Sequence, residues 1–120
     1  MKFLKTAMVF SVAFVFLAAG VSKFAGAPGV VEIFERFGLP RWFMLATGAI
    51  ELIGALSLLA PARRARFFGG ALLSVTMIVG AAFHVAFDPP PAAIPAILLA
   101  LATGAIAAAN AGGNVRAPAH

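Results

Sequence analysis

Cysteine is absent from this 120-residue chain, which excludes a disulfide framework, thiolate catalysis and thiolate-bound zinc or iron–sulfur centres within it. Charge is scarce as well: charged residues make up 11% of the chain, against roughly a quarter in soluble domains. Hydrophobic residues make up 62%, and so small a chain has too little interior to hide that much apolar surface from water. Lipid is therefore the expected solvent for much of the surface.

What the chain does contain is four long apolar segments, over residues 6–24, 42–60, 67–87 and 92–109. Each is close to the ~20 residues that a helix needs to cross a bilayer. Their apolar character is continuous rather than alternating, which favours helices over barrel strands. With short connections between them, the segments predict an all-α fold: an antiparallel four-helix transmembrane bundle forming a single domain over residues 1–120.

The first connection is longer than the others and is amphipathic. Apolar residues recur in it at helical spacing, with charged residues between them: Val30, Ile33, Phe34 and Phe37 alternate with Glu32, Glu35 and Arg36. This pattern predicts a short amphipathic helix over residues 30–37 in the first outer loop. Such a helix either lies at the lipid–water interface or caps the mouth of the bundle.

The basic residues set an orientation. Six lie on one side of the threaded chain and three on the other: Lys2, Lys5, Arg63, Arg64, Arg66 and Arg116 against Lys23, Arg36 and Arg41. The positive-inside rule then predicts a multi-pass protein of the cell (inner) membrane with both termini cytoplasmic. Because these charges form no stripe with interleaved aromatics, nucleic acid is not an expected partner.

The N-terminal segment has a second interpretation. Lys2 and Lys5, the apolar run and Ala25-Gly-Ala27 also fit a cleavable signal peptide. The apolar run is long, however, and Lys23 interrupts the usual approach to a cleavage site. We therefore expect the first segment to remain as a membrane-spanning helix.

Glu51 is the most informative residue, because it lies at the centre of the otherwise uncharged segment 42–60. A carboxylate there costs about 2.5 kcal/mol or more and normally faces a partner or a cavity. Threading places Lys23 and His84 in the same half of the bilayer. Helical spacing adds Gly48 to the face of Glu51 and Met77 to the face of His84. The sequence thus predicts a ligand-binding site in the outer half of the bundle, made by Lys23, Trp42, Gly48, Glu51, Met77 and His84.

Each polar residue also has a purely structural interpretation. Lys23 can extend to the headgroups, and His84 can be a neutral, hydrogen-bonded histidine within the bundle. Glu51 can be a neutral acid that holds helices together, since a neutral acid is far cheaper to bury. Trp42 fits an aromatic-belt anchor.

Other chemistry has little support. The two histidines are His84 and His120, so a bis-histidine haem would need the C-terminal tail, and no metal site is expected. No nucleophile elbow accompanies His84 and Asp88, which lie four residues apart. We therefore expect no catalytic residue, and an enzyme acting alone is the least favoured hypothesis.

Three stretches carry a family resemblance: LAAGVSKFAGAPG, FERFGLPRWF and ATGAIELIGALSLLAP. In this order and spacing they resemble the DoxX family, specifically its DoxX-like branch of small four-helix membrane proteins, over about residues 10–108. The most specific matches are Gly20 with Lys23, Gly38-Leu-Pro40, and Gly48 with Glu51 and Gly54. The resemblance implies a place in a membrane oxidoreductase system. The missing cysteines depart from the thiol chemistry of the wider grouping.

Together these observations favour a non-catalytic accessory subunit of a quinone-linked membrane redox system. Its outer-half pocket would bind a quinone or a lipid. The expected partners are the lipid bilayer, an oxidoreductase subunit and further copies of the chain. The alternative is a small transporter or proton-coupled carrier that uses Glu51, since intramembrane carboxylates mark proton pathways.

Overall fold

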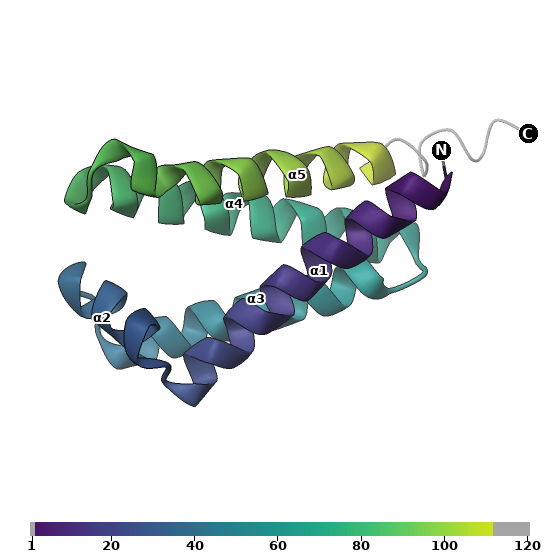
Figure 1. The fold of residues 1–120 in the computed structure, drawn as a ribbon. Coiled ribbons are helices and arrows are strands. Elements are labelled where there is room, and N and C mark those ends of the chain that lie inside the picture. The colour runs from purple at the N-terminus through teal and green to yellow at the C-terminus, as the bar shows by residue number, and fades with distance from the viewer. Residues whose placement is uncertain (1, 112–120) are drawn as a thin grey trace, which may run out of the picture.

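The computed structural model describes residues 2–111, and all the regular secondary structure in this part is helical (Figure 1). The elements are α1 (Lys2–Ala25), α2 (Pro28–Arg36), α3 (Arg41–Leu59), α4 (Arg63–Phe87), the short 3₁₀ helix η1 (Pro90–Ala93) and α5 (Ile94–Ala111). Within residues 2–111, four helices are long and apolar enough to cross a membrane. The predicted all-α transmembrane bundle is confirmed, whereas Arg116 and His120 lie outside the described residues.

Local sequence explains where the helices begin and end. Gly26 and Gly38 have positive φ values of 68° and 75°, so α2 lies between two glycine turns that other residues would strain. Pro28 occupies the first turn of α2, where its missing N–H is tolerated, and α2 therefore begins two residues before the predicted start. The connection between α3 and α4 is short, because α4 already begins at Arg63, four residues before the predicted apolar segment 67–87.

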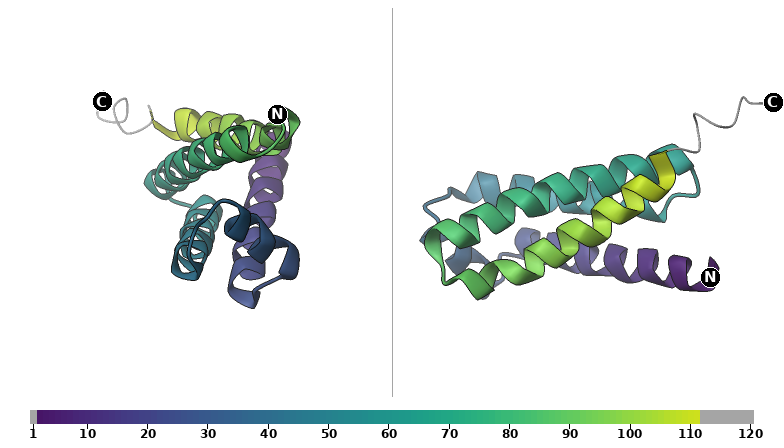
Figure 2. Two further views of the ribbon diagram at one scale, coloured as in Figure 1. Left: turned by 90° about the vertical axis from the view of Figure 1, so that its left-hand side faces the viewer. Right: turned by 90° about the horizontal axis from the view of Figure 1, so that it is seen from above.

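The helices form two layers, which Figures 1 and 2 show from three directions. The first layer is the antiparallel pair α1 and α3, and the second is the pair α4 and α5; α3 also packs against α4. Glycines allow these close approaches. A Cβ atom on Gly20 of α1 would lie 2.9 Å from the carbonyl oxygen of Gly48 in α3, and one on Gly69 of α4 would lie 2.7 Å from that of Gly54.

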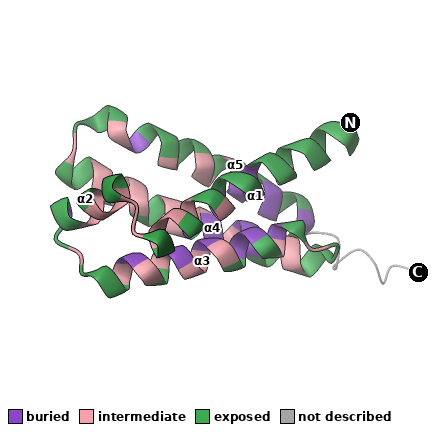
Figure 3. Ribbon diagram, turned by 60° about the horizontal axis from the view of Figure 1, so that its bottom comes forward, coloured by how far each residue is buried: buried purple, intermediate pink, exposed green. Residues whose placement is uncertain are grey.

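The buried core lies toward the end of the bundle that carries the N-terminus. It comprises residues of all four long helices: Val12, Ala13, Phe16, Ala55, Leu58, Leu73 and Ile106. Figure 3 shows much of the buried part of the chain gathered where α1 passes over α3 and α4, while the layers diverge toward α2 (Figure 1). We call this end of the bundle the α2 end. Large apolar side chains such as Phe3 and Phe14 point outward, as expected for helices that contact lipid.

Candidate functional site

A cavity of about 510 Å³ lies between the two layers toward the α2 end. All four long helices and α2 contribute to its lining, which is mostly apolar. The polar and ionisable residues in the lining are Lys23, Thr47, Glu51, Thr76 and His84. The cavity begins where the core ends. Three residues line the cavity and also belong to the core or pack against it: Phe16, Met77 and Leu99.

Lys23 and Glu51 form an ion pair in the cavity wall. The Lys23 Nζ lies 2.9 Å from the Glu51 Oε1, and the two side chains are 12% and 3% exposed. The pair lacks hydrogen-bond geometry, so Oε1 is buried without a hydrogen-bond partner. Each charge offsets much of the cost of burying the other in a low-dielectric site. The pair places one cationic and one anionic group together in the otherwise mostly apolar wall.

Gly48 makes this pairing sterically accessible. A Cβ atom on Gly48 would lie 3.0 Å from the Lys23 Cβ and 3.2 Å from the Gly20 carbonyl oxygen. Because Gly48 has no side chain, the lysine stem can cross α3 and reach Glu51 one turn further along. Gly48 therefore positions the pair rather than lining the cavity.

His84 lines the same cavity but binds elsewhere. Its Nδ1 lies 2.7 Å from the Oδ2 of Asp88, which follows α4 directly. Asp88 also accepts two hydrogen bonds from Arg36 at the end of α2, at 2.9 Å from Nε and 3.1 Å from Nη2. We call Arg36, His84 and Asp88 the α2 latch. The latch ties α2, which is attached to the first layer, to the second layer.

Aromatic packing reinforces this closure. Phe37, directly after α2, stacks on Phe83 with a centroid separation of 5.4 Å and contacts Phe87 at 5.5 Å. The His84 ring meets it edge-on at 5.2 Å. Phe37 is buried, so the amphipathic helix caps the α2 end of the cavity, one of the two positions that the sequence left open.

The latch has an expected pH dependence. The hydrogen bonds from Arg36, and then that to His84, lower the pKa of Asp88 below its ordinary value, and the Asp88 hydrogen bonds raise the pKa of Arg36. A carboxyl whose pKa is lowered by folding stabilises the fold above its ordinary pKa of about 4, and this contribution is lost as the pH falls through the folded-state pKa.

We therefore expect the wild type to melt at a higher temperature than Asp88→Asn from pH 7 down to about pH 5, with the gap closing below about pH 4. Thermal melts of the two proteins in the same detergent measure this gap. The other acidic residues are common to both proteins, so the difference reports on Asp88 and its contacts with Arg36 and His84. A gap that stays constant to pH 3 would show that the carboxylate charge does not contribute.

The other expected site residues are placed differently. Met77 lines the cavity, whereas Trp42 is 68% exposed, packs on Phe43 and does not line it. Sequence reasoning missed Thr47 and Thr76, whose hydroxyls donate to the carbonyl oxygens of Phe43 and Leu72. These threonines therefore present only acceptor oxygen to a ligand, and the Lys23 ammonium is the donor that the wall offers.

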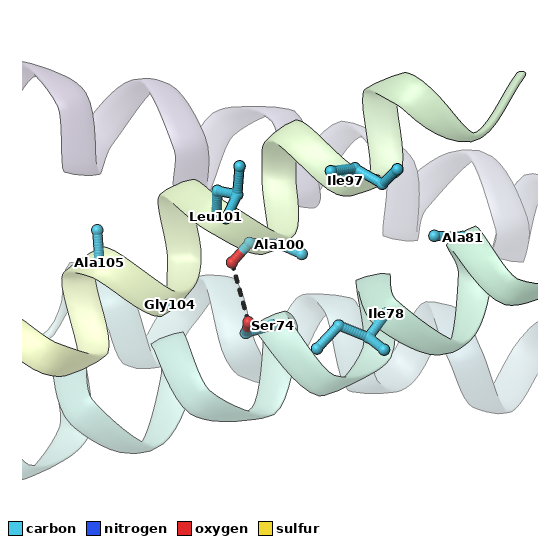
Figure 4. Close-up of a pocket in the computed structure, with 8 residues that line it drawn as sticks. All are labelled: Ser74, Ile78, Ala81, Ile97, Ala100, Leu101, Gly104 and Ala105. Carbon is cyan, nitrogen blue, oxygen red and sulfur yellow. Dashed lines mark hydrogen bonds between the residues drawn. The ribbon is translucent and has the colours of Figure 1, made fainter. Parts of the chain in front are cut away.

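A second depression, of about 580 Å³, lies between α4 and α5 (Figure 4). Its lining is apolar apart from Ser74, whose hydroxyl donates to the Ala100 carbonyl oxygen at 2.9 Å. Because its polar group is already satisfied and no ionisable side chain reaches it, this groove offers no chemistry. Within residues 2–111, no group of three or more His, Asp or Glu side chains is placed to hold a metal ion.

Comparison with known proteins adds a family context. The sequence model of the DoxX-like family matches residues 7–105. A Bacillus subtilis (strain 168) protein described as "Uncharacterized protein YdgD" is 35% identical over 75 residues, which are 62% of this chain and 66% of the relative. "Putative oxidoreductase CatD" of the same organism is 34% identical over 82 residues, 63% of this chain and 54% of the relative. No solved structure matches the chain.

Proposed function

The chain belongs to the DoxX-like family, as its resemblance predicted, and on that premise we propose that it is a non-catalytic accessory subunit of a membrane redox system that holds a small quinone-like amphiphile in its cavity. The observation that carries the proposal is the Lys23–Glu51 pair in the wall of an otherwise mostly apolar cavity. The similarity to "Putative oxidoreductase CatD" supports a redox setting. The chain spans only about half the length of that relative.

The chemistry of the wall fits such a ligand. A cavity of about 510 Å³ falls within the roughly 300–1,000 Å³ of small-molecule sites. A ring carbonyl can accept a hydrogen bond from the Lys23 ammonium, and the hydroxyl of a reduced ring can donate to the Glu51 carboxylate. This ion pair in a mostly apolar cavity therefore suits both redox states of a carbonyl-bearing ring.

The direction of insertion belongs to the same proposal. The excess of Lys and Arg at the N-terminus and the α3–α4 turn supports cytoplasmic termini in the cell membrane, with α2 and the cavity in the outer half. The partner would be an oxidoreductase subunit that exchanges electrons with the bound ligand. The alternative role of Glu51 as a proton carrier gains little support, because its carboxylate is engaged with Lys23.

Ligand-dependent stabilisation tests the proposal. We expect ubiquinone or menaquinone, added at about 100 times its dissociation constant, to stabilise the detergent-solubilised protein by about 2.7 kcal/mol, because a ligand that binds only the folded state shifts unfolding by mass action. The measurement is the melting temperature with and without quinone.

Two variants make this test specific. Glu51→Gln should lose most of the quinone-dependent shift, whereas Trp42→Phe should keep it, because Trp42 lies outside the cavity lining. A wild-type protein whose melting temperature is unchanged by either quinone, and which carries none on purification, would contradict the proposal.

A further inference from the structure

The cavity lining is exposed on the two sides of the cavity that run along the helices, which we call its flanks: one on α1 and one on α4. Among the described lining residues, the exposed ones are three valines: Val15 of α1 at 44%, and Val75 and Val79 of α4 at 61% and 46%. All three lie within helices long and apolar enough to span a membrane. The cavity is therefore bounded by side chains that themselves face the lipid.

Toward water, by contrast, the cavity is covered. The lining residues that come from α2 and the turn after it are buried or half-buried: Val30, Ile33, Phe34, Phe37 and Leu39. The α2 latch and the stacking of Phe37 on Phe83 and Phe87 hold this cover against α4. A solute coming from the aqueous side at the α2 end must displace these contacts, whereas a molecule already in the bilayer meets only apolar side chains at the flanks.

The flank between α3 and α4 is the better entrance. Val75 and Val79 lie one turn apart, with the cavity-lining Thr76 between them, and Thr47 and Ile50 of α3 also line the cavity. On the other flank, Val15 is followed directly by Phe16, which is buried in the core. The exposed edge at Val75 and Val79 is thus longer and leads to the wall that contains Glu51.

Resting on the proposed function, we infer that the ligand is a lipid-borne amphiphile that enters from the bilayer between α3 and α4. Its uncharged polar head lies at Lys23 and Glu51, and its apolar chain passes out beside Val75 and Val79. The head is uncharged because the two wall charges already offset each other, and a third would be unpaired in a low-dielectric site.

Two probes with the same head group distinguish recognition of the head from recognition of its apolar tail. One is a dimethoxy-methyl-benzoquinone with a decyl tail, and the other is the same ring without the tail. Binding is measured in nanodiscs and expressed against the probe concentration in the lipid phase. Val79→Trp narrows the flank, and Val85→Trp is the matched control, because Val85 is an exposed valine of α4 outside the lining.

We expect Val79→Trp to weaken binding of the decyl probe about tenfold or more, which is a loss of about 1.4 kcal/mol, and to leave the chainless ring unchanged. Val85→Trp should bind both probes like the wild type. If both probes bind in a Glu51-dependent way but Val79→Trp affects neither, lateral entry is wrong and the proposed function stands. If neither probe binds the wild type, the proposed function is wrong, and the route of entry must be tested without a ligand.

A ligand-free measurement keeps the inference testable in that case. Ile50 is half-buried and lines the cavity, and Trp42 is the single native tryptophan, so Ile50→Trp in a Trp42→Phe background places one fluorophore in the cavity. We expect brominated acyl chains to quench it strongly and aqueous iodide to quench it weakly. Strong quenching by iodide with little quenching by brominated lipid would show a cavity open to water and would overturn the inference.

Discussion

Lys23→Met is expected to destabilise the bundle by about 3–5 kcal/mol, the range for removing one member of a buried ion pair. The remaining Glu51 carboxylate is 3% exposed and would have no cation within reach in the cavity wall. Adding Glu51→Leu should recover most of the loss, because the double variant removes both charges and leaves apolar side chains in an apolar wall. Reversible unfolding in mixed detergent micelles measures both free energies.

Lys5→Met is the matched control for this cycle, since Lys5 is an exposed lysine of the same helix and should change the unfolding free energy by less than about 0.5 kcal/mol. A double variant as unstable as Lys23→Met would show that the loss comes from the lysine stem rather than from the unpaired carboxylate. The structural interpretation of Lys23 as a headgroup anchor would then be favoured.

Gly70→Ala is expected to cost about 1–3 kcal/mol, because α4 and α5 touch backbone to backbone at this residue. A Cβ atom there would lie 2.7 Å from the carbonyl oxygen of Thr103 and 2.9 Å from the amide nitrogen of Ala107. Neither atom can rotate away as the end of a flexible side chain could, so the two helices must move apart.

Gly80 in the same helix is the matched control, because nothing lies within 4 Å of its added Cβ atom. Gly80→Ala should stabilise the protein by up to about 1 kcal/mol, the difference in helix propensity between the two residues. Unfolding free energies measured under one set of conditions give the comparison. Equal effects of the two substitutions would contradict the close α4–α5 packing.

The sequence could predict the spans because length and composition alone decide whether a helix suits a bilayer. It could also predict that Lys23 and Glu51 lie at a similar depth, because threading the antiparallel segments places both toward the same end of the bundle. Gly48 was expected on the correct face, although its role is to let the lysine stem pass. These inferences depend on depth and helical period, which the chain itself encodes.

The hydrogen-bond partner of His84 does not follow from the sequence. Asp88 lies four residues further along, but this spacing alone does not show that the two side chains meet or that Arg36 joins them. Arg36 lies on α2, and its distance from Asp88 depends on how the two layers diverge, which no local pattern encodes. Trp42 was likewise assigned to the site from its depth, although the rotation of α3 turns it away from the cavity. Uniformly apolar helices carry little information about that rotation.

In the proposed function, Lys23 and Glu51 form the polar point at which the cavity holds its ligand. The most direct measurement is the amount of decyl benzoquinone bound per chain in nanodiscs, for the wild type, Lys5→Met and the folded Lys23→Met/Glu51→Leu double variant. We expect about one molecule per chain in the first two and affinity at least about tenfold weaker in the third, since its wall offers no polar group at that point. Unchanged binding by the folded double variant would show that Lys23 and Glu51 do not hold the ligand, which contradicts the proposed function.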